Sequence, residues 1–314
     1  MAEIKPFVTR DLADFAFRTG RGDVPRQVVQ FIQDDLAALI LSAARSSTQA
    51  EVEKTAELLR HLGGAPVCSI MFSSRSADPV RAALQNGIQC GRDKGPDRVK
   101  AATELATAIW PAALAAAEFG GADGSALIVA VAVGWEVALR LRKGLEPDHE
   151  ARGFSPVATC GTFGAAVAAA LLLGLDRGGL LNALGLAASY AGGLSAVQSN
   201  AADDGIAAGL AASAGVEVAC LARAGLTGPP DAIEGAQGFG RAVSDTFDAS
   251  SVVDRLGVEW LAATDASRSS AVTLIKQSLR STLLNLRPDL NADAWLAKIS
   301  DLDEIDNASE ILIQ

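Results

Sequence analysis

Residues 99–142 read VKAATELATAIWPAALAAAEFGGADGSALIVAVAVGWEVALRLR, and this stretch decides the fold. Alanine is its commonest residue, and alanine favours the α-helix because it has no side-chain conformations to lose on folding. We predict two helices here, at about residues 99–119 and 125–142. Small side chains let helices approach one another closely, so these helices should pack tightly.

Further helices are predicted on both sides from the helical spacing of apolar residues and from helix-end signals. Thr9 is the expected N-cap of the first, and Pro25 begins the second. Residues 67–72 predict a strand or an extended connection, and residues 86–97 predict a loop because they are rich in Gly, Pro and charge. The other predicted helices lie at about residues 51–62, 79–84, 162–173, 180–194, 205–224, 272–286 and 293–299. The predicted fold class is therefore all-α, a compact helical bundle.

The composition narrows the function classes. The formal net charge is -10 and no Lys/Arg run is present, which disfavours nucleic acid as a partner. The four cysteines are widely spaced and the first residues do not resemble a signal peptide, so we expect reduced thiols in a cytoplasmic protein. The two histidines have no neighbours at metal-ligand spacing, so we expect no metal site.

Two stretches without charged residues, 154–175 and 178–202, are about long enough to span a bilayer. Both are rich in small and polar residues, and Gln198 and Asn200 would be costly in lipid. Lys/Arg anchors at the membrane boundaries are also missing. We therefore predict a buried helical hairpin and no membrane association.

Four segments together resemble the MmgE/PrpD family, which includes 2-methylcitrate dehydratase, cis-aconitate decarboxylase and iminodisuccinate epimerase. Residues 110–118 resemble its PAxLAxAE helix, residues 134–141 its GYEVxxRL helix, residues 152–166 its RGFHxTxxxGxFGAA segment, and residues 209–229 its GxAAxxGxxAAxLAxxGFTGP segment. The resemblance implies a helical domain at residues 1–250, a reduced remnant of an α/β lid with C-terminal helices at residues 251–314, a cofactor-free site and a homodimer.

The chain departs from the family at the positions that carry its chemistry. Where the family has histidines, this sequence has Gly91, Ser155 and Ala207, and a further histidine position falls near Glu104. The family lysine is replaced by Asp204, next to Asp203. A substrate with several carboxylates would meet like charge there, at a cost of order 1 kcal/mol per contact. Dehydration of 2-methylcitrate and decarboxylation of cis-aconitate are therefore disfavoured.

The candidate catalytic residues are Asp203, Asp204 and Glu104. A helix N-cap is the commoner explanation of an Asp pair before an Ala-rich helix, and a carboxylate pair with separated pKa values is the functional one. The helical spacing of the sequence alone indicates that Glu104 is a solvent-exposed residue of a helix. The candidate substrate-binding residues, taken from the family's site-lining loop and from nearby segments, are Arg92, Lys94, Asp97, Ser155 and Tyr190. A solvated loop explains the first three equally, and Tyr190 falls within an apolar predicted helix, where core packing is commoner.

Two functions are consistent with these features. The first is a cofactor-independent isomerase, cyclase or lyase, with carboxylate acid/base assistance, that acts on a small, weakly anionic or hydrophobic metabolite of secondary metabolism. The second is a non-catalytic binding or partner subunit, which the loss of the family's catalytic residues favours. Retained dehydratase-type activity is a third hypothesis that would need an anionic substrate to bind without the usual cations.

Overall fold

The computed structural model describes residues 7–93, 102–198, 205–263, 269–287 and 289–312. Within these ranges the chain is built from helices, with one two-stranded antiparallel sheet in which β1 (Cys68–Ser69) pairs with β2 (Ser76–Ala77). The all-α prediction is confirmed, and residues 67–72 contribute the short strand β1.

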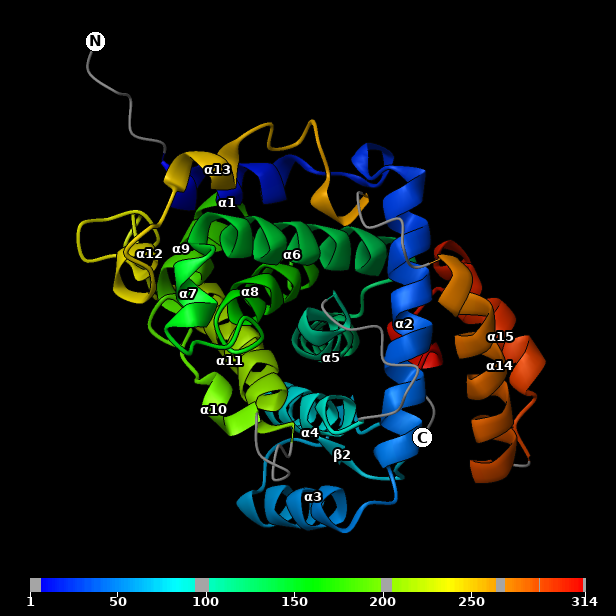
Figure 1. Cartoon of the computed structure of the whole chain (residues 1–314). Helices are drawn as coiled ribbons and strands as arrows, with labels where there is room; N and C mark the ends of the chain where they lie inside the picture. Colours follow the sequence, from blue (N-terminus) through cyan, green and yellow to red (C-terminus); the bar gives the residue numbers. More distant parts are fainter. Residues whose placement is uncertain (1–6, 94–101, 199–204, 264–268, 288, 313–314) are drawn as a thin grey trace.

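The helices enclose one central element (Figure 1). The N-terminal helices are α1 (Val8–Arg18), α2 (Arg26–Ser46), α3 (Ala50–Leu62) and α4 (Pro79–Gly91). The middle ones are α5 (Ala102–Gly120), α6 (Gly124–Leu145), α7 (Asp148–Ala151), α8 (Cys160–Leu172), α9 (Arg177–Ala187), α10 (Ser195–Gln198) and α11 (Ile206–Arg223). The last are α12 (Phe239–Val243), α13 (Ala249–Val253), α14 (Ser269–Leu286) and α15 (Ala292–Ser300), with short 3-10 turns between several of them.

Helix α5 is the central element, and Figure 1 shows it end-on between α2, α4, α6 and α8. Its residues from Leu105 to Ala117 are buried on every side, which an apolar, Ala-rich sequence allows. Its one indole N–H, on Trp110, donates to Asp35 Oδ2 of α2 at 3.0 Å. The central helix therefore joins the bundle by small apolar contacts and a few polar bonds, which include those from Ser69 N and Oγ to the Glu118 carboxylate at 2.8 and 2.7 Å.

Glycines set the distances between the central helices. A Cβ on Gly134 of α6 would lie 2.7 Å from the carbonyl oxygen of Gly164 in α8, and one on Gly164 would lie 2.6 Å from that of Gly134. Helix α11 approaches α4 equally closely, since a Cβ on Gly87 would lie 2.7 Å from Gly209 Cα. Any larger side chain at these positions would push the helices apart.

The predicted loop at residues 86–97 is wrong in its first part, because α4 continues to Gly91. Asn86 is buried, and its side chain hydrogen-bonds to the backbone of β1 and of the segment directly after it. Its Oδ1 accepts from Met71 N and its Nδ2 donates to the Ser69 carbonyl, each at 3.0 Å. Two of the glycines that suggested a loop, Gly87 and Gly91, face Gly209 of α11 and its N-cap residue Gly205. Residues 94–97 lie outside the described ranges.

The start of α1 also differs from the prediction. The helix begins at Val8, so Thr9 is not its N-cap. Instead, the backbone N–H and the hydroxyl of Thr9 both donate to Glu234 Oε2, at 3.1 and 2.6 Å. A carboxylate 225 residues away therefore stabilises this helix terminus.

A buried ion pair fastens the segment that follows α12 to the core. Arg140 and Glu136 of α6 are each about 1% exposed, and Arg140 Nε donates to Glu136 Oε1 at 2.6 Å. The remaining guanidinium N–H groups donate to the carbonyls of Val252, Asp254, Arg255 and Glu259 at 2.7–3.4 Å. Glu136 Oε2 accepts from Leu261 N at 2.8 Å. Burial raises the pKa of Glu136 despite these partners.

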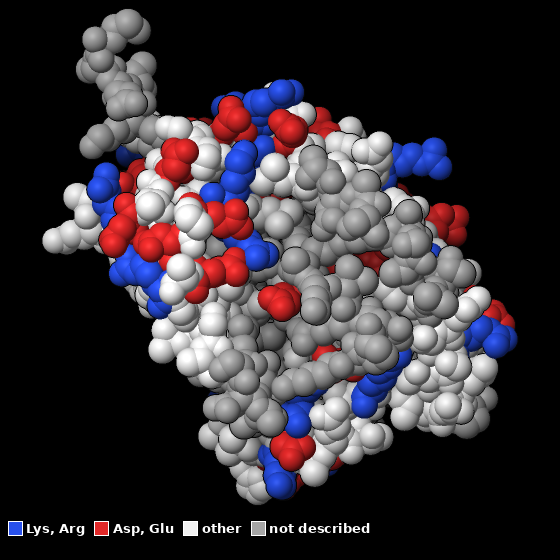
Figure 2. Space-filling model, viewed as in Figure 1, with Lys and Arg blue, Asp and Glu red and all other residues white. Residues whose placement is uncertain are grey.

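The described part beyond residue 250 packs against the bundle rather than standing apart. Helix α13 contacts α1 and α6, whereas α14 and α15 lie along α2 (Figure 1). On the face drawn in Figure 2, basic and acidic side chains are interspersed among the residues that are described. The proposed boundary near residue 250 stays a prediction.

Two helices, α6 and α11, are long and apolar enough to cross a membrane by length and composition. Buried residues make up 78% of the most apolar window of α6 and 56% of that of α11, as expected for core helices. The predicted hairpin is confirmed as α8, which is almost entirely buried, packed against α9. Helix α9 ends at Ala187, earlier than predicted, so Tyr190 lies in the turn after it.

We predict that Arg140→Met lowers the free energy of unfolding by about 3–5 kcal/mol, because it leaves the Glu136 carboxylate buried without its cation. The matched control is Arg280→Met, which removes a bidentate pair with Asp293 that is half exposed. That change should cost little of the free energy of unfolding, because solvent screens an exposed pair. Urea denaturation at pH 7 measures both, and equal losses in the two variants would contradict the role given to Arg140.

Candidate functional site

A groove of about 350 Å³ runs along α11, and we take it as the candidate ligand site. Its volume is near the lower end of the range for small-molecule pockets. The lining residues come from α8 and the turn before it, from the turn after α9, and from α11. They are Ala158, Thr162, Tyr190, Gly192, Gly193, Leu194, Ile206, Ala207, Leu210, Ala211, Ser213, Ala214 and Glu217.

Helix α11 presents one face to the groove and another to the core. Ile206, Leu210, Ser213 and Glu217 recur at intervals of three or four residues, which places them on one side of the helix. A flanking side carries Gly209, whose Cβ would lie 2.6 Å from the Leu84 carbonyl oxygen of α4, and the opposite side carries Gly215, whose Cβ would lie 2.5 Å from Ala165 Cβ of α8. Close packing on the core side therefore aims the other side at the groove.

The second wall is the turn after α9, at residues 190–194, which backbone bonds fix to the segment around Phe154. Ser155 N donates to the Gly193 carbonyl at 3.0 Å, and Ser195 N donates to the Gly153 carbonyl at 2.8 Å. Gly193 is required at this contact because a Cβ there would collide with Ala158 Cβ. These bonds hold the two sides of the groove at a fixed separation.

Behind this wall lies a buried histidine. His149 is 1% exposed, and its Nε2 lies 3.0 Å from Thr159 Oγ1, which donates to the Ser155 carbonyl at 2.7 Å. Because that hydroxyl has a single proton, Nε2 must be the donor to Thr159, and Nδ1 is then an acceptor. Nδ1 has no partner among the described residues. Burial lowers the pKa of His149, so the ring is neutral at pH 7.

The groove is mostly apolar, and its polar side chains are few. The Thr162 hydroxyl donates to the Ala158 carbonyl at 2.9 Å, and the Ser213 hydroxyl donates to the Leu210 carbonyl at 3.0 Å. Tyr190 is 40% exposed, and Glu217 is exposed. Among the lining residues that the structure describes, none is Lys, Arg or His.

The residues predicted from sequence are spread over several surroundings. Tyr190 lines the groove, and Ser155 is fully buried in the wall behind it, where its hydroxyl accepts from Ala158 N at 3.5 Å. Glu104 is partly exposed in the first turn of α5 and does not line the groove. Arg92 donates to Gln49 Oε1 at 2.7 Å and to Glu51 Oε2 at 3.2 Å, joining α4 to α3. Asp203, Asp204, Lys94 and Asp97 lie outside the described ranges.

Sequence reasoning missed two residues. Glu217 shares a helix face with Ile206 and Leu210, and this periodicity was a usable signal, but nothing in the sequence showed which face meets the groove. His149 entered the sequence analysis only as one of two histidines without metal-ligand spacing. Its neighbour Cys160 does not serve as a nucleophile, because complete burial raises the pKa of that thiol to about 12.

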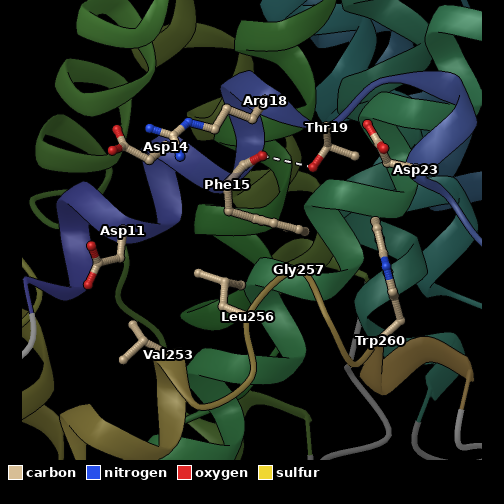
Figure 3. Close-up of a pocket in the computed structure, with 10 residues that line it drawn as sticks. All are labelled: Asp11, Asp14, Phe15, Arg18, Thr19, Asp23, Val253, Leu256, Gly257 and Trp260. Carbon is tan, nitrogen blue, oxygen red and sulfur yellow. Dashed lines mark hydrogen bonds between the residues drawn. The ribbon is translucent and has the colours of Figure 1, made fainter.

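A second cavity, of about 550 Å³, lies between α1 and residues 253–260 (Figure 3). Phe15 and Trp260 meet in it edge to face, 5.5 Å apart. Two of its three carboxylates have structural partners: Asp14 is paired with Arg177, and Asp23 accepts from Gly20 N. Burial and the neighbouring Asp14 raise the pKa of the third, Asp11. Because these groups serve local structure, we take the α11 groove as the candidate site.

Comparison with known proteins shows which family the chain belongs to. The family model of the MmgE/PrpD N-terminal domain matches residues 10–251. The chain belongs to the MmgE/PrpD family. It is 28% identical over 271 residues to the cis-aconitate decarboxylase-like protein oryM of Aspergillus oryzae, covering 81% of this chain and 56% of that protein. It is 35% identical over 172 residues to the Homo sapiens cis-aconitate decarboxylase, covering 52% of this chain and 34% of that protein.

The chain thus spans about half the length, or less, of these curated relatives. Within the MmgE/PrpD match, the groove contains Ala207, the position at which the sequence resemblance places a family histidine. The groove therefore coincides with a position of functional interest in the family, and an apolar methyl group stands there in this chain.

We predict that His149 makes the protein less stable as the pH falls below about 6.5. The unfolded chain binds a proton on this ring near that pH. The folded chain binds it only at lower pH, so stability present above pH 6.5 is lost on acidification, at no more than about 1.4 kcal/mol per pH unit. Urea unfolding at pH 7.5 and 5.5 should show a larger loss for the wild type than for His149→Gln.

The control is His61→Gln, since His61 is exposed on α3. This variant should follow the wild-type pH dependence. Parallel curves for the wild type and His149→Gln would mean that His149 is protonated equally in both states, contrary to its buried position.

Proposed function

We propose that this chain is a cofactor-independent enzyme that acts as an isomerase, cyclase or lyase on a small, hydrophobic or weakly anionic metabolite of secondary metabolism. The observation that carries the proposal is the groove along α11, which has apolar walls and no cationic side chain among its described lining residues. A substrate with several carboxylates needs cations to offset its desolvation, whereas an apolar molecule gains from burial there.

Acid/base assistance is assigned to carboxylates. Asp203 and Asp204 come directly before Gly205, the N-cap residue of α11, and Glu104 lies one turn before Ala108 of α5. Ala108 packs with Ala208 and Ala211, and Ala211 lines the groove. The proposed role of the three carboxylates rests on these places in the sequence. Tyr190 is proposed as a hydrogen-bonding group for the substrate.

The alternative is a non-catalytic binding or partner subunit. One observation favours it: four large apolar residues at the groove, Tyr190, Leu194, Ile206 and Leu210, are 40–56% exposed. Such a rim suits a surface that another protein covers. A homodimer, which the family resemblance implies, is a further proposal. Retained lyase activity on cis-aconitate is supported by the names of the relatives and opposed by the missing cations.

We predict that deleting the gene from its native host changes the pool of one small metabolite, as measured by untargeted mass spectrometry. Accumulation of a compound with the mass of the product indicates an isomerase or cyclase. A difference of one water or one CO₂ indicates dehydration or decarboxylation. An unchanged metabolite profile would contradict the enzyme proposal and favour the partner-subunit alternative.

Complementation with Asp204→Asn separates the two functions. In an enzyme that uses this carboxylate, the variant should fold with an unchanged melting temperature and fail to restore the metabolite. A partner subunit should tolerate the substitution and co-purify with a second protein in a stable complex. Incubation of the purified chain with cis-aconitate, followed by NMR for loss of CO₂, tests the family activity directly.

A further inference from the structure

The polar side chains of the α11 groove are mostly hydrogen-bond acceptors. A hydroxyl group has one proton and two lone pairs. The Thr162 and Ser213 protons are used on the Ala158 and Leu210 carbonyls, which leaves both oxygens only as acceptors. Glu217 is a carboxylate and accepts as well. Of the described side chains in the groove, Tyr190 alone retains a proton that no hydrogen bond to another described residue engages.

Glu217 carries the only formal charge among the described lining side chains. It has no hydrogen-bond or ion-pair partner among the described residues, and its helical neighbours at three and four positions are Ser213, Ala214, Cys220 and Leu221. No cation on α11 is therefore placed to neutralise it. A cationic group of a ligand in the groove could therefore pair with the Glu217 carboxylate without displacing another described side chain.

The apolar part of the groove continues away from this carboxylate along the same helix face. From Glu217 the lining passes Ala214, Leu210 and Ala207 to Ile206, which lies 11 residues or about 16 Å away along the helix. The opposite wall adds Leu194 and the methylene surface of Gly192 and Gly193. The groove thus has an apolar length with a charged group at one end.

We infer that the ligand of this groove is an amphipathic amine: an apolar body lying along α11 with a protonated amino group at Glu217. This inference rests on the proposed function. Among the hydrophobic substrates proposed there, it selects those that carry an amino group, and it excludes the weakly anionic substrates. An ammonium group at Glu217 meets acceptors there, because Ser213 lies one turn before it on the same helix face, whereas a carboxylate would face Glu217 as like charge and Ser213 as a second acceptor.

A competing arrangement places an anionic head at the other end, where the first backbone N–H groups of α11 have no helical acceptor. The two arrangements predict opposite orders of affinity for probes that share one body. Suitable probes are 4-phenylbutylamine, 4-phenylbutan-1-ol and 4-phenylbutanoate, titrated into the purified full chain by calorimetry at pH 7.

We expect the amine to bind most tightly, the alcohol next and the carboxylate at least tenfold more weakly than the amine. Glu217→Gln should weaken the amine by about three- to fivefold, the effect of one exposed ion pair, and should change the alcohol by less than twofold. Glu57→Gln makes the same charge change on the exposed surface of α3 and should leave all three affinities unaltered. Gly192→Leu should block every probe, because Gly192 lines the groove and a Cβ there meets nothing within 4 Å, so the larger side chain fits without displacing its neighbours.

Each outcome decides between the two proposals. If the alcohol binds and Gly192→Leu blocks it, the groove is a ligand site and the proposed function stands. Equal affinity for amine and alcohol, tighter binding of the carboxylate, or an unchanged amine affinity in Glu217→Gln then overturns the amine inference alone. Failure of all three probes to bind overturns the inference and the proposed ligand site together.

Discussion

The buried Glu136–Arg140 pair is the interaction on which the outer layer of this fold depends. One guanidinium satisfies four carbonyls of residues 252–259, and the carboxylate receives the amide of Leu261. Those carbonyls lie at the end of α13 and in the irregular segment after it, where the Arg255 carbonyl also accepts from Val258 N and Glu259 N. The pair therefore adds buried side-chain hydrogen bonds that anchor this segment to α6. The walls of the second cavity follow from it, since Leu256, Gly257 and Trp260 lie in the same segment.

A different constraint fixes the inner layer. Helices α4, α6, α8 and α11 touch through glycine, and their backbones approach until carbonyl oxygens stand where a Cβ would be. Such contacts gain dispersion energy from many close atom pairs, and they allow little variation in helix position. The position of α11 relative to α8 determines the width of the groove. Its geometry is thus a consequence of core packing several residues away from any ligand.

Much of this was predictable from the sequence, and the failures have physical causes. Alanine content and helical periodicity predicted α2, α3, α5, α6 and α8 to within a few residues. Residues 86–97 were expected to form a loop because they are rich in Gly, Pro and charge, yet α4 continues to Gly91, where its glycines allow close packing against Gly209 and Gly205. Thr9 was misassigned because Glu234, the partner of its amide, lies far along the chain. The candidate site shows the same dependence on contacts between distant parts of the chain. Local patterns predicted helix α11, but only the wall opposite α11 shows that Glu217 lines a groove.

The two faces of α11 explain how a family scaffold can carry a different ligand preference. Gly209 and Gly215 lie against α4 and α8, where substitution would separate the helices. Leu210, Ser213 and Glu217 project into the groove, where substitution changes the chemistry offered to a ligand and leaves the core contacts in place. A chain can therefore keep the packing face, and with it the MmgE/PrpD fold, while the side chains on the groove face vary. Membership in the family accordingly constrains the backbone of α11 more strongly than it constrains the side chains that line the groove.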